Sequence, residues 1–402
     1  MQNYFSLRLW PVASRRTLDM PKILELFCGA SGFGLGAEMA GFELVAAVDN
    51  DPFTTFSHKA NFPHCNLLLA DLAHMSGHDL LETLGLKHGD IDGVIGGPPC
   101  QGFSRGGLRN PEDPRNNLLK RFFILVSYIN PAFFVMENVP GLLDRDNEAV
   151  VAAAFSAIPN NYALFGPIKL NAKNFGAPTN RERVILVGYD PRRIDLSLVK
   201  AAFLYSESNV NVEDAIADLP NPDVAIEDAD GFFWGEYTKS VDSISQYAAC
   251  MRVASKEALQ PSSYLRHSGD RSRLVSGINP TKHTDAVRNR FDALPQGCRD
   301  KTSKALRLDW AGLCPTLRAG TGSDRGSYQA LRPIHPDQPR MITIREAARL
   351  QGFPDWFQFH PTIWHSFRMI GNSVSPVFSK RLLTVISQQL GSDFRPKCVV
   401  NS

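Results

Sequence analysis

The sequence predicts an α/β protein with a doubly wound, mostly parallel β-sheet and a second, smaller, loop-rich domain. First, short apolar runs alternate with stretches of helical length between residues 22 and 188. Apolar strands separated by helices are typical of a parallel sheet that is covered on both faces. Second, the composition changes after about residue 204. Third, a chain of 402 residues with 43% hydrophobic content is long enough for two domains.

Six apolar runs are the expected strands. They are ILELF (23–27), LVAAV (44–48), NLLLA (66–70), IDGVIG (91–96), FFVM (133–136) and VILVG (184–188). Ligands of this fold class bind beyond the carboxyl ends of the strands. The groups that follow the first five runs are the loop FCGASGFGLG (27–36), Asp49, Asp71, Pro99–Cys100 and Glu137–Asn138. We therefore expect these groups to line one site.

The loop after the first run can pass close to a ligand, because its glycines adopt backbone conformations that other residues avoid. Asp49 follows about 20 residues later, where an acidic side chain can bind both hydroxyls of a ribose. The loop lacks the GK[ST] ending of a P-loop, so ATP hydrolysis is not expected. The pattern indicates a nucleoside-type cofactor, either a dinucleotide or S-adenosylmethionine.

Cys100 follows two prolines at a strand end and precedes a polar, glycine-rich stretch. A free cysteine is often a small buried hydrophobe. A stiff backbone before a flexible loop also suits an attacking thiolate that is covered when substrate binds. No histidine is indicated as its base, which disfavours papain-like acyl transfer, and the second cysteine of a zinc deaminase is missing after Cys100.

Glu137 leaves a buried strand just before a turn, a position that suits proton donation to a substrate. Arg181 and Arg183 stand two residues apart at the start of VILVG, so strand periodicity places both on one face and Glu182 on the other. Two guanidiniums aimed at one cleft suit a carbonyl oxygen or a phosphate. Surface ion pairs are the alternative interpretation of the two arginines.

The composition of the second domain changes along the chain. Residues 205–242 carry ten acidic residues and one lysine, whereas residues 251–330 carry fourteen Lys or Arg and seven Asp or Glu. We expect a loop-rich domain that is basic on one side, and the alternative is a solvated surface of mixed charge.

Beyond the second domain, Thr343 and Glu346 form a capping box at the start of a helix. A final helix is expected from Pro376.

Several protein classes are not favoured. The seven cysteines are scattered and form no CxxC pair, so we expect no disulfide framework, no metal site and a reducing cytoplasmic compartment. No apolar run approaches the roughly 20 residues that span a membrane. The net charge of +2 neither requires nor excludes a polyanionic partner. Residues 1–20 are expected to be a disordered extension, with an organelle-targeting peptide or a start at Met20 as alternatives.

Taken together, six motifs resemble the DNA (cytosine-5) methyltransferase family of the bacterial restriction-modification type. The resemblance covers roughly residues 22 to 390, and the motifs are FCGASGFG, GGPPCQGFS, ENVPG, PTNRERVILVG, REAARLQGFP and GNSV. It implies that Cys100 attacks carbon 6 of a cytosine and that Glu137 protonates or hydrogen-bonds its ring nitrogen 3. Carbon 5 then takes the methyl group of S-adenosylmethionine. The cytosine must be flipped out of the duplex to reach such a site.

The resemblance also implies roles for individual residues. Phe27 packs on the adenine of the cofactor, Asp49 binds the ribose, and Asp71 contacts the adenine amino group. Arg183 holds oxygen 2 of the cytosine, with Arg181 beside it as a further catalytic residue. The remaining implied cofactor residues are Gly29, Gly32, Asn50, Pro99, Asn372 and Ser373, and the implied contacts to the DNA backbone are Ser104 and Arg115.

The chain departs from the family pattern at two positions. Thr179 stands where many members have Gln, which removes a supporting contact in the cleft. Asn50 stands where some members have Trp, so stacking on the cofactor there is lost.

The expected domain organisation follows the same resemblance. The segments are an extension (1–20), a catalytic and cofactor-binding domain (21–204), a target-recognition domain (205–345), a hinge (346–370) and a returning C-terminal helix (371–392). Duplex DNA is expected to pass between the two domains of a monomer that is cytoplasmic and associated with the nucleoid. A cognate restriction endonuclease would act separately. The alternatives are a tRNA cytosine-5 methyltransferase of the same superfamily and a catalytically inactive DNA-binding regulator.

Overall fold

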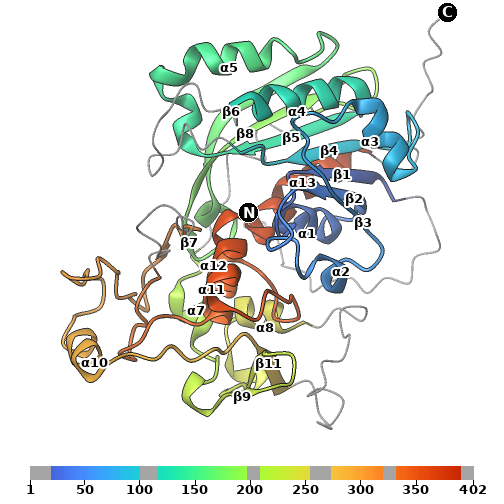
Figure 1. Cartoon of the computed structure of the whole chain (residues 1–402). Coiled ribbons are helices and arrows are strands. Elements are labelled where there is room, and N and C mark those ends of the chain that lie inside the picture. The colour runs from blue at the N-terminus through green and yellow to red at the C-terminus, as the bar shows by residue number, and fades with distance from the viewer. Residues whose placement is uncertain (1–19, 100–115, 197–208, 254–272, 320–331, 391–402) are drawn as a thin grey trace, which may run out of the picture.

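A computed structural model shows a lobe built on a central β-sheet above a second lobe (Figure 1). The residues described are 20–99, 116–196, 209–253, 273–319 and 332–390. The sheet-bearing lobe contains the described residues between 20 and 196 and the last helix. The second lobe contains those between 209 and 343.

The central sheet has seven strands in the order β3-β2-β1-β4-β5-β8-β6. The strands are β1 (Lys22–Leu26), β2 (Glu43–Asp49), β3 (Asn66–Leu69), β4 (Gly93–Gly96), β5 (Phe133–Asn138), β6 (Ala163–Asn171) and β8 (Glu182–Tyr189). All six expected strands are present. Five of them, β1 to β5, pair with their neighbours among these five in parallel. The predicted α/β fold class with a mostly parallel sheet is confirmed.

The far edge of the sheet differs from the expectation. Strand β8, the VILVG run, is antiparallel to both β5 and β6. Strand β6 was not expected, because Gly166 and Pro167 interrupt its apolar pattern and such a pair usually marks a turn. Proline is tolerated at this position because β6 is the edge strand of the sheet and its register shifts between Phe165 and Ile168.

Helices cover both faces of the sheet, as a doubly wound fold requires (Figure 1). On one face α1 (Gly32–Met39) and α13 (Pro376–Leu390) pack on alternate strand residues such as Ile23 and Ile95. The opposite face is covered by α3 (Gly77–Leu84), α4 (Asn116–Ile129) and α5 (Glu148–Phe155). The short α2 (His58–Asn61) follows β2.

The second lobe is built from short elements. Its small antiparallel sheet has the order β11-β10-β9, with β9 (Ile226–Glu227), β10 (Phe233–Glu236) and β11 (Leu274–Ser276). Its helices are α7 (Val212–Ile216), α8 (Gln246–Arg252) and α10 (Asp285–Asp292). One parallel ladder joins the lobes, because β7 (Thr179–Asn180) pairs with β12 (Cys314–Pro315).

Two helices lie between the lobes, α11 (Ile344–Gln351) and α12 (Ile363–Asn372) (Figure 1). All eight residues of α11 are buried. The predicted capping box at Thr343 and Glu346 is confirmed, and so is the start of the final helix at Pro376. A single apolar core runs from the sheet face through Ile344 to Ile278 of the second lobe, so the lobes share one interior. No helix in the described ranges is long and apolar enough to cross a membrane.

Candidate active site

The strand order reverses between β1 and β4, and the carboxyl ends of these two strands carry the glycine loop and the segment that leads to Cys100. In doubly wound sheets, ligands bind in the crevice at such a switch point. Cys100 itself lies outside the described residues, as do Ser104 and Arg115. Pro98 and Pro99, which precede Cys100 in the sequence, and the neighbouring strand ends are described.

The glycine loop turns sharply at the end of β1. Phe27, Gly29 and Ser31 all have positive φ angles, of 58°, 52° and 53°. Such a conformation is rare for residues other than glycine and marks a loop held by its surroundings. The Asp49 carboxylate holds this loop, because it accepts the Gly29 N–H at 2.8 Å and the Asp51 N–H at 2.9 Å. Burial raises the pKa of Asp49, and the two N–H donors act against that rise.

The C-terminal segment returns to the same loop. A Cβ added to Gly32 would lie 2.3 Å from the carbonyl oxygen of Val374 and 3.0 Å from Cβ of Ser373, so only glycine fits there. The Ser379 hydroxyl donates to the carbonyl oxygen of Gly32 at 3.2 Å. These contacts bring Ser373, which is buried, and Asn372, which is exposed, to the glycine loop.

The other predicted cofactor residues lie along the same edge of the sheet. Phe27 and Pro99 are half-buried at the ends of β1 and β4. Asn50 and Asp71 are exposed after β2 and β3, and the Asp71 carboxylate accepts the N–H of Ala73 at 2.9 Å.

Glu137 and Arg183 form an ion pair beside the segment that leads to Cys100. Nε of Arg183 lies 2.6 Å from Oε1 of Glu137, and the two side chains are 12% and 10% exposed. Glu137 is the penultimate residue of β5, and a Cβ added to Gly97 would lie 3.2 Å from its Oε2. The Asn138 side-chain amide donates to the carbonyl oxygen of Pro98 at 3.1 Å. Strand β5 therefore fixes both Glu137 and the proline segment.

The side chain of Arg181 binds backbone carbonyls in the interior and does not face the cleft with Arg183, contrary to the sequence-based expectation. Its side chain is buried and donates to the backbone carbonyls of Leu317, Gly371 and Ser373 at 3.1, 2.9 and 2.9 Å. β8 begins only at Glu182, so the strand periodicity that relates the two arginines does not extend to Arg181. Thr179 is also buried, and its hydroxyl donates to the carbonyl oxygen of Cys314 at 3.2 Å.

Three features of this region were missed at the sequence level. Glu25 lies buried on β1 beneath the glycine loop, and burial raises its pKa to about 8. A single carboxylate inside the apolar run ILELF is the signal that could have revealed it. The Gln351 amide donates to the carbonyl oxygen of Ser373 at 2.9 Å, and Arg368 forms an ion pair with Asp51. No local sequence pattern indicates these last two contacts.

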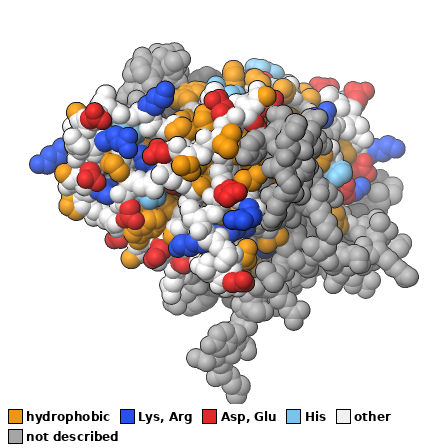
Figure 2. Space-filling model, turned by 90° about the horizontal axis from the view of Figure 1, so that it is seen from below, with side chains coloured by type: hydrophobic (Ala, Val, Ile, Leu, Met, Phe, Trp, Pro, Cys, Tyr) orange, Lys and Arg blue, Asp and Glu red, His pale blue; other side chains and the backbone are white. Residues whose placement is uncertain are grey.

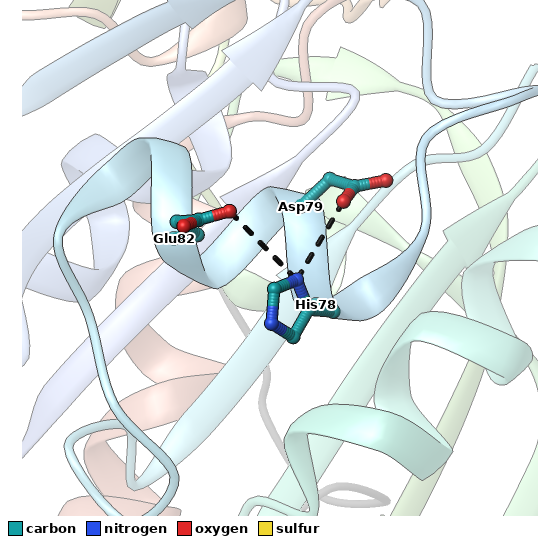
Figure 3. Close-up of side chains that lie close together, drawn as sticks. All are labelled: His78, Asp79 and Glu82. Atoms are coloured by element: carbon teal, nitrogen blue, oxygen red, sulfur yellow. Dashed lines mark ion pairs between the residues drawn. The ribbon is translucent and has the colours of Figure 1, made fainter.

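A cluster of His78, Asp79 and Glu82 lies elsewhere, exposed on α3 (Figure 3). Nδ1 of His78 is 3.6 Å from Asp79 and 3.8 Å from Glu82. It is the one group of three potential metal ligands found within the part of the chain that the structure describes. Hydrogen bonding to Ser76 lowers the pKa of Asp79, which fits helix capping and surface ion pairing.

The surface charge of the second lobe is mixed where it is described. Viewed from below, its Lys and Arg side chains are scattered among acidic and hydrophobic ones (Figure 2). Part of the basic segment predicted between 251 and 330 lies outside the described residues, which omit 254–272 and 320–331.

Comparison with known proteins identifies the family. Residues 21–388 match the family model of C-5 cytosine-specific DNA methylases. The chain is 40% identical over 369 residues to the Type II methyltransferase M.XorII of Xanthomonas oryzae pv. oryzae, covering 90% of this chain and 84% of that protein. It is 31% identical over 387 residues to the Type II methyltransferase M.DdeI of Desulfomicrobium norvegicum, covering 91% and 88%.

A solved structure of an E. coli prophage protein described as a DNA modification methyltransferase has the same fold. The two structures match with a TM-score of 0.79 and 36% sequence identity. The match covers 92% of this chain and 99% of that chain. These similarities do not favour the tRNA alternative. The chain belongs to the C-5 cytosine-specific DNA methylase family, whose activity is methylation of cytosine in DNA at carbon 5.

Proposed function

We propose that the protein transfers the methyl group of S-adenosylmethionine to carbon 5 of a flipped-out cytosine in a specific duplex sequence, through a covalent adduct with Cys100. The observation that carries this mechanism is the buried Glu137–Arg183 pair, whose atoms lie 2.6 Å apart. It stands beside Gly97, three residues before Cys100. An acid and a cation beside the segment that leads to Cys100 suit addition of a thiol to a cytosine ring.

The glycine loop fits S-adenosylmethionine. A Cβ added to Gly29 would meet no atom within 4 Å, so the loop has open space on that side. Each Asp49 oxygen accepts one backbone N–H and retains a lone pair for a ribose hydroxyl. Phe27, Gly32, Asn50, Asp71, Pro99, Asn372 and Ser373 would complete the pocket. When bound, the cofactor supplies an electrophilic methyl group on a sulfonium.

The residues of the chain then have distinct tasks. The Cys100 thiolate forms a bond to carbon 6 of the cytosine, and Glu137 holds a proton at ring nitrogen 3, so electron density moves to carbon 5. Arg183 fixes the Glu137 carboxyl and reaches oxygen 2 of the ring. After methyl transfer, a base removes the carbon 5 proton, the bond between Cys100 and carbon 6 breaks with release of the thiolate, and the proton at ring nitrogen 3 returns to Glu137.

The second lobe would act as the target-recognition domain. DNA would lie between the lobes, where Ser104 and Arg115 of the loop after Cys100 would contact its backbone. We further propose that the modification protects the host's own DNA in the cytoplasm against an endonuclease of the same sequence specificity.

Transfer of radiolabelled methyl groups from S-adenosylmethionine tests the proposal on mixed-sequence duplex DNA and, separately, on tRNA. The wild-type protein should label the duplex. The Cys100→Ser variant should lose labelling yet bind the cofactor as the wild type does. Cys298→Ser is the matched control, because Cys298 is an exposed thiol in the second lobe. Full turnover by Cys100→Ser would exclude the covalent mechanism, and labelling of tRNA alone would exclude DNA as the substrate.

A further inference from the structure

The side chain of Arg181 gathers three backbone segments that are distant in sequence. Nη1 donates to the carbonyl oxygen of Leu317 at 3.1 Å, and Nη2 donates to those of Gly371 and Ser373 at 2.9 Å each. The residue is 2% exposed. Among the described residues, its side-chain hydrogen bonds all go to neutral carbonyls, and the charge of Glu137 acts on it without a direct hydrogen bond.

The acceptors of Arg181 belong to the wall beside the glycine loop. Gly371 lies in the last turn of α12 and Ser373 is its C-cap, and we call these residues the Gly371–Ser373 turn. Ser373 packs closely on Gly32, because a Cβ added to Gly32 would lie 3.0 Å from Cβ of Ser373. The Ser373 carbonyl also accepts from the Gln351 side chain at 2.9 Å. Arg181 and Gln351 therefore use the same oxygen and fix its position from two sides.

The backbone of Arg181 is fixed equally well. Its N–H donates to the Asn171 side-chain oxygen at 3.1 Å, and its carbonyl accepts the N–H of Ala172 at 2.9 Å. Two residues further on, Arg183 meets Glu137 at 2.6 Å. One short piece of chain thus carries both the guanidinium that holds the Gly371–Ser373 turn and the guanidinium that holds Glu137.

A buried guanidinium whose hydrogen bonds, among the described residues, all go to neutral carbonyls is a costly way to hold a fold together, because the charge has lost its water and no carboxylate accepts those hydrogen bonds. Burial, and next the charge of Arg183, lower the pKa of Arg181 well below its ordinary value. The planar fork of arginine can reach three oxygens in fixed directions, which the single ammonium of lysine cannot. The arrangement is therefore suited to precise placement of the segments.

We propose that Arg181 is a positioning residue that couples the cofactor pocket to the Glu137–Arg183 pair by holding the Gly371–Ser373 turn against the strand that carries Arg183. The inference rests on the proposed function, and it replaces the expectation that Arg181 contacts substrate. Cofactor binding restrains the Gly371–Ser373 turn. Through Arg181, this restraint also fixes the start of β8, the strand that carries Arg183.

The matched control is Arg345, a second buried arginine that also holds backbone carbonyls. It is 1% exposed and donates to the carbonyl oxygens of Ser276, Pro354 and Phe357 at 2.8 to 2.9 Å. None of these acceptors belongs to the glycine loop, the Gly371–Ser373 turn or the Glu137–Arg183 pair. Arg181→Lys and Arg345→Lys therefore make the same chemical change in two surroundings.

The experiment measures thermal unfolding and the Kd of S-adenosylmethionine by calorimetry for both full-length variants. It repeats the Kd with a duplex that carries the methylation site mapped for the wild type. Both variants should lose thermal stability. Only Arg181→Lys should weaken cofactor binding, by on the order of tenfold for a lost charge-assisted hydrogen bond. In Arg181→Lys, DNA should also change the Kd of the cofactor much less than it does in the wild type.

Each outcome decides the inference. Equal effects of Arg181→Lys and Arg345→Lys on cofactor affinity, or a wild-type Kd in Arg181→Lys, would overturn it. If Arg181→Lys does not fold, Gln351→Met removes the other donor to the Ser373 carbonyl. That variant should weaken cofactor binding, and an unchanged Kd would refute the role of the turn. Failure of the wild type to bind S-adenosylmethionine would instead refute the proposed function.

Discussion

The junction between the lobes depends on Arg349, whose replacement should be among the most destabilising single changes in the protein. The side chain is 0% exposed on α11. It donates to the Asp355 carboxylate at 2.8 and 2.7 Å, to the Asp218 carboxylate at 2.6 and 3.1 Å, and to the carbonyl oxygen of Ala215. Asp218 belongs to the second lobe, so this one guanidinium joins α11 to that lobe.

The size of the effect follows from what Arg349→Met leaves behind. Two carboxylates with side chains only 4% and 6% exposed would lose their main counter-charge, although Arg252 still contacts Asp218 at 2.5 Å. Breaking a buried ion pair from one side typically costs about 3 to 5 kcal/mol, because the remaining charge stays buried without compensation. We expect a loss in that range from Arg349→Met.

Urea unfolding of the full-length protein at pH 7 measures the loss. Arg273→Met is the control, because Arg273 lies 3.9 Å from Glu236 with side chains that are 67% and 66% exposed, and surface pairs contribute less than about 1 kcal/mol. The double variant Arg349→Met, Asp355→Asn should recover part of the loss, because residue 355 then carries no charge and Asp218 keeps its ion pair with Arg252. A cost for Arg349→Met as small as that for Arg273→Met would refute the reasoning.

Three further predictions concern Glu25, Gly371 and the basic residues between 251 and 330. Burial raises the pKa of Glu25 from 4.5 to about 8, so the folded protein retains a proton that the unfolded chain releases, and stability falls as pH rises through this window. Between pH 6 and pH 8.5, the free energy of unfolding of the wild type should fall by about 3 kcal/mol more than that of Glu25→Gln. Urea midpoints that change equally with pH in the two proteins would contradict this. Gly371→Ala should cost about 1 to 3 kcal/mol and weaken cofactor binding, because its Cβ would lie 2.7 Å from the backbone of Arg318 and Ala319, and a wild-type melting temperature would refute it. Binding of duplex DNA, followed by fluorescence anisotropy, should weaken steeply with added salt if basic residues between 251 and 330 meet phosphates, whereas a flat dependence would exclude that interface.

Much of the sheet could be predicted from sequence because its strands are local patterns. The runs that became β1 to β5 are short, apolar and bounded by turn residues, and the helix start at Thr343 has both partners of its capping box within four residues. The position of Asp49 beside the glycine loop was also predictable, since consecutive strands of a parallel sheet end at one edge.

The remaining features depend on information that a local pattern does not hold. An apolar run such as VILVG reveals burial but not strand direction, so the antiparallel pairing of β8 could not be inferred. Strand β6 was hidden because Gly166 and Pro167 suggest a turn, whereas the edge position that tolerates proline is a property of the assembled sheet.

Arg181 illustrates the same limit at the candidate site. Periodicity predicts that its side chain lies on one face with that of Arg183, but its acceptors lie at Leu317, Gly371 and Ser373, more than 130 residues along the chain. Which long-range partner a buried arginine meets is decided by the packing of the lobes. Glu25 differs, because a charged residue in an apolar strand is itself a sequence signal, although its protonation depends on burial.

The most direct test of the account is bisulfite sequencing of DNA from cells that lack cytosine methylation and express either the wild-type protein or its Cys100→Ser variant. The wild type should leave unconverted cytosines at one recurring position of a short duplex sequence, and the variant should leave none. Complete conversion in cells that contain folded wild-type protein, or equal protection by the variant, would contradict cytosine-5 methylation of DNA through Cys100.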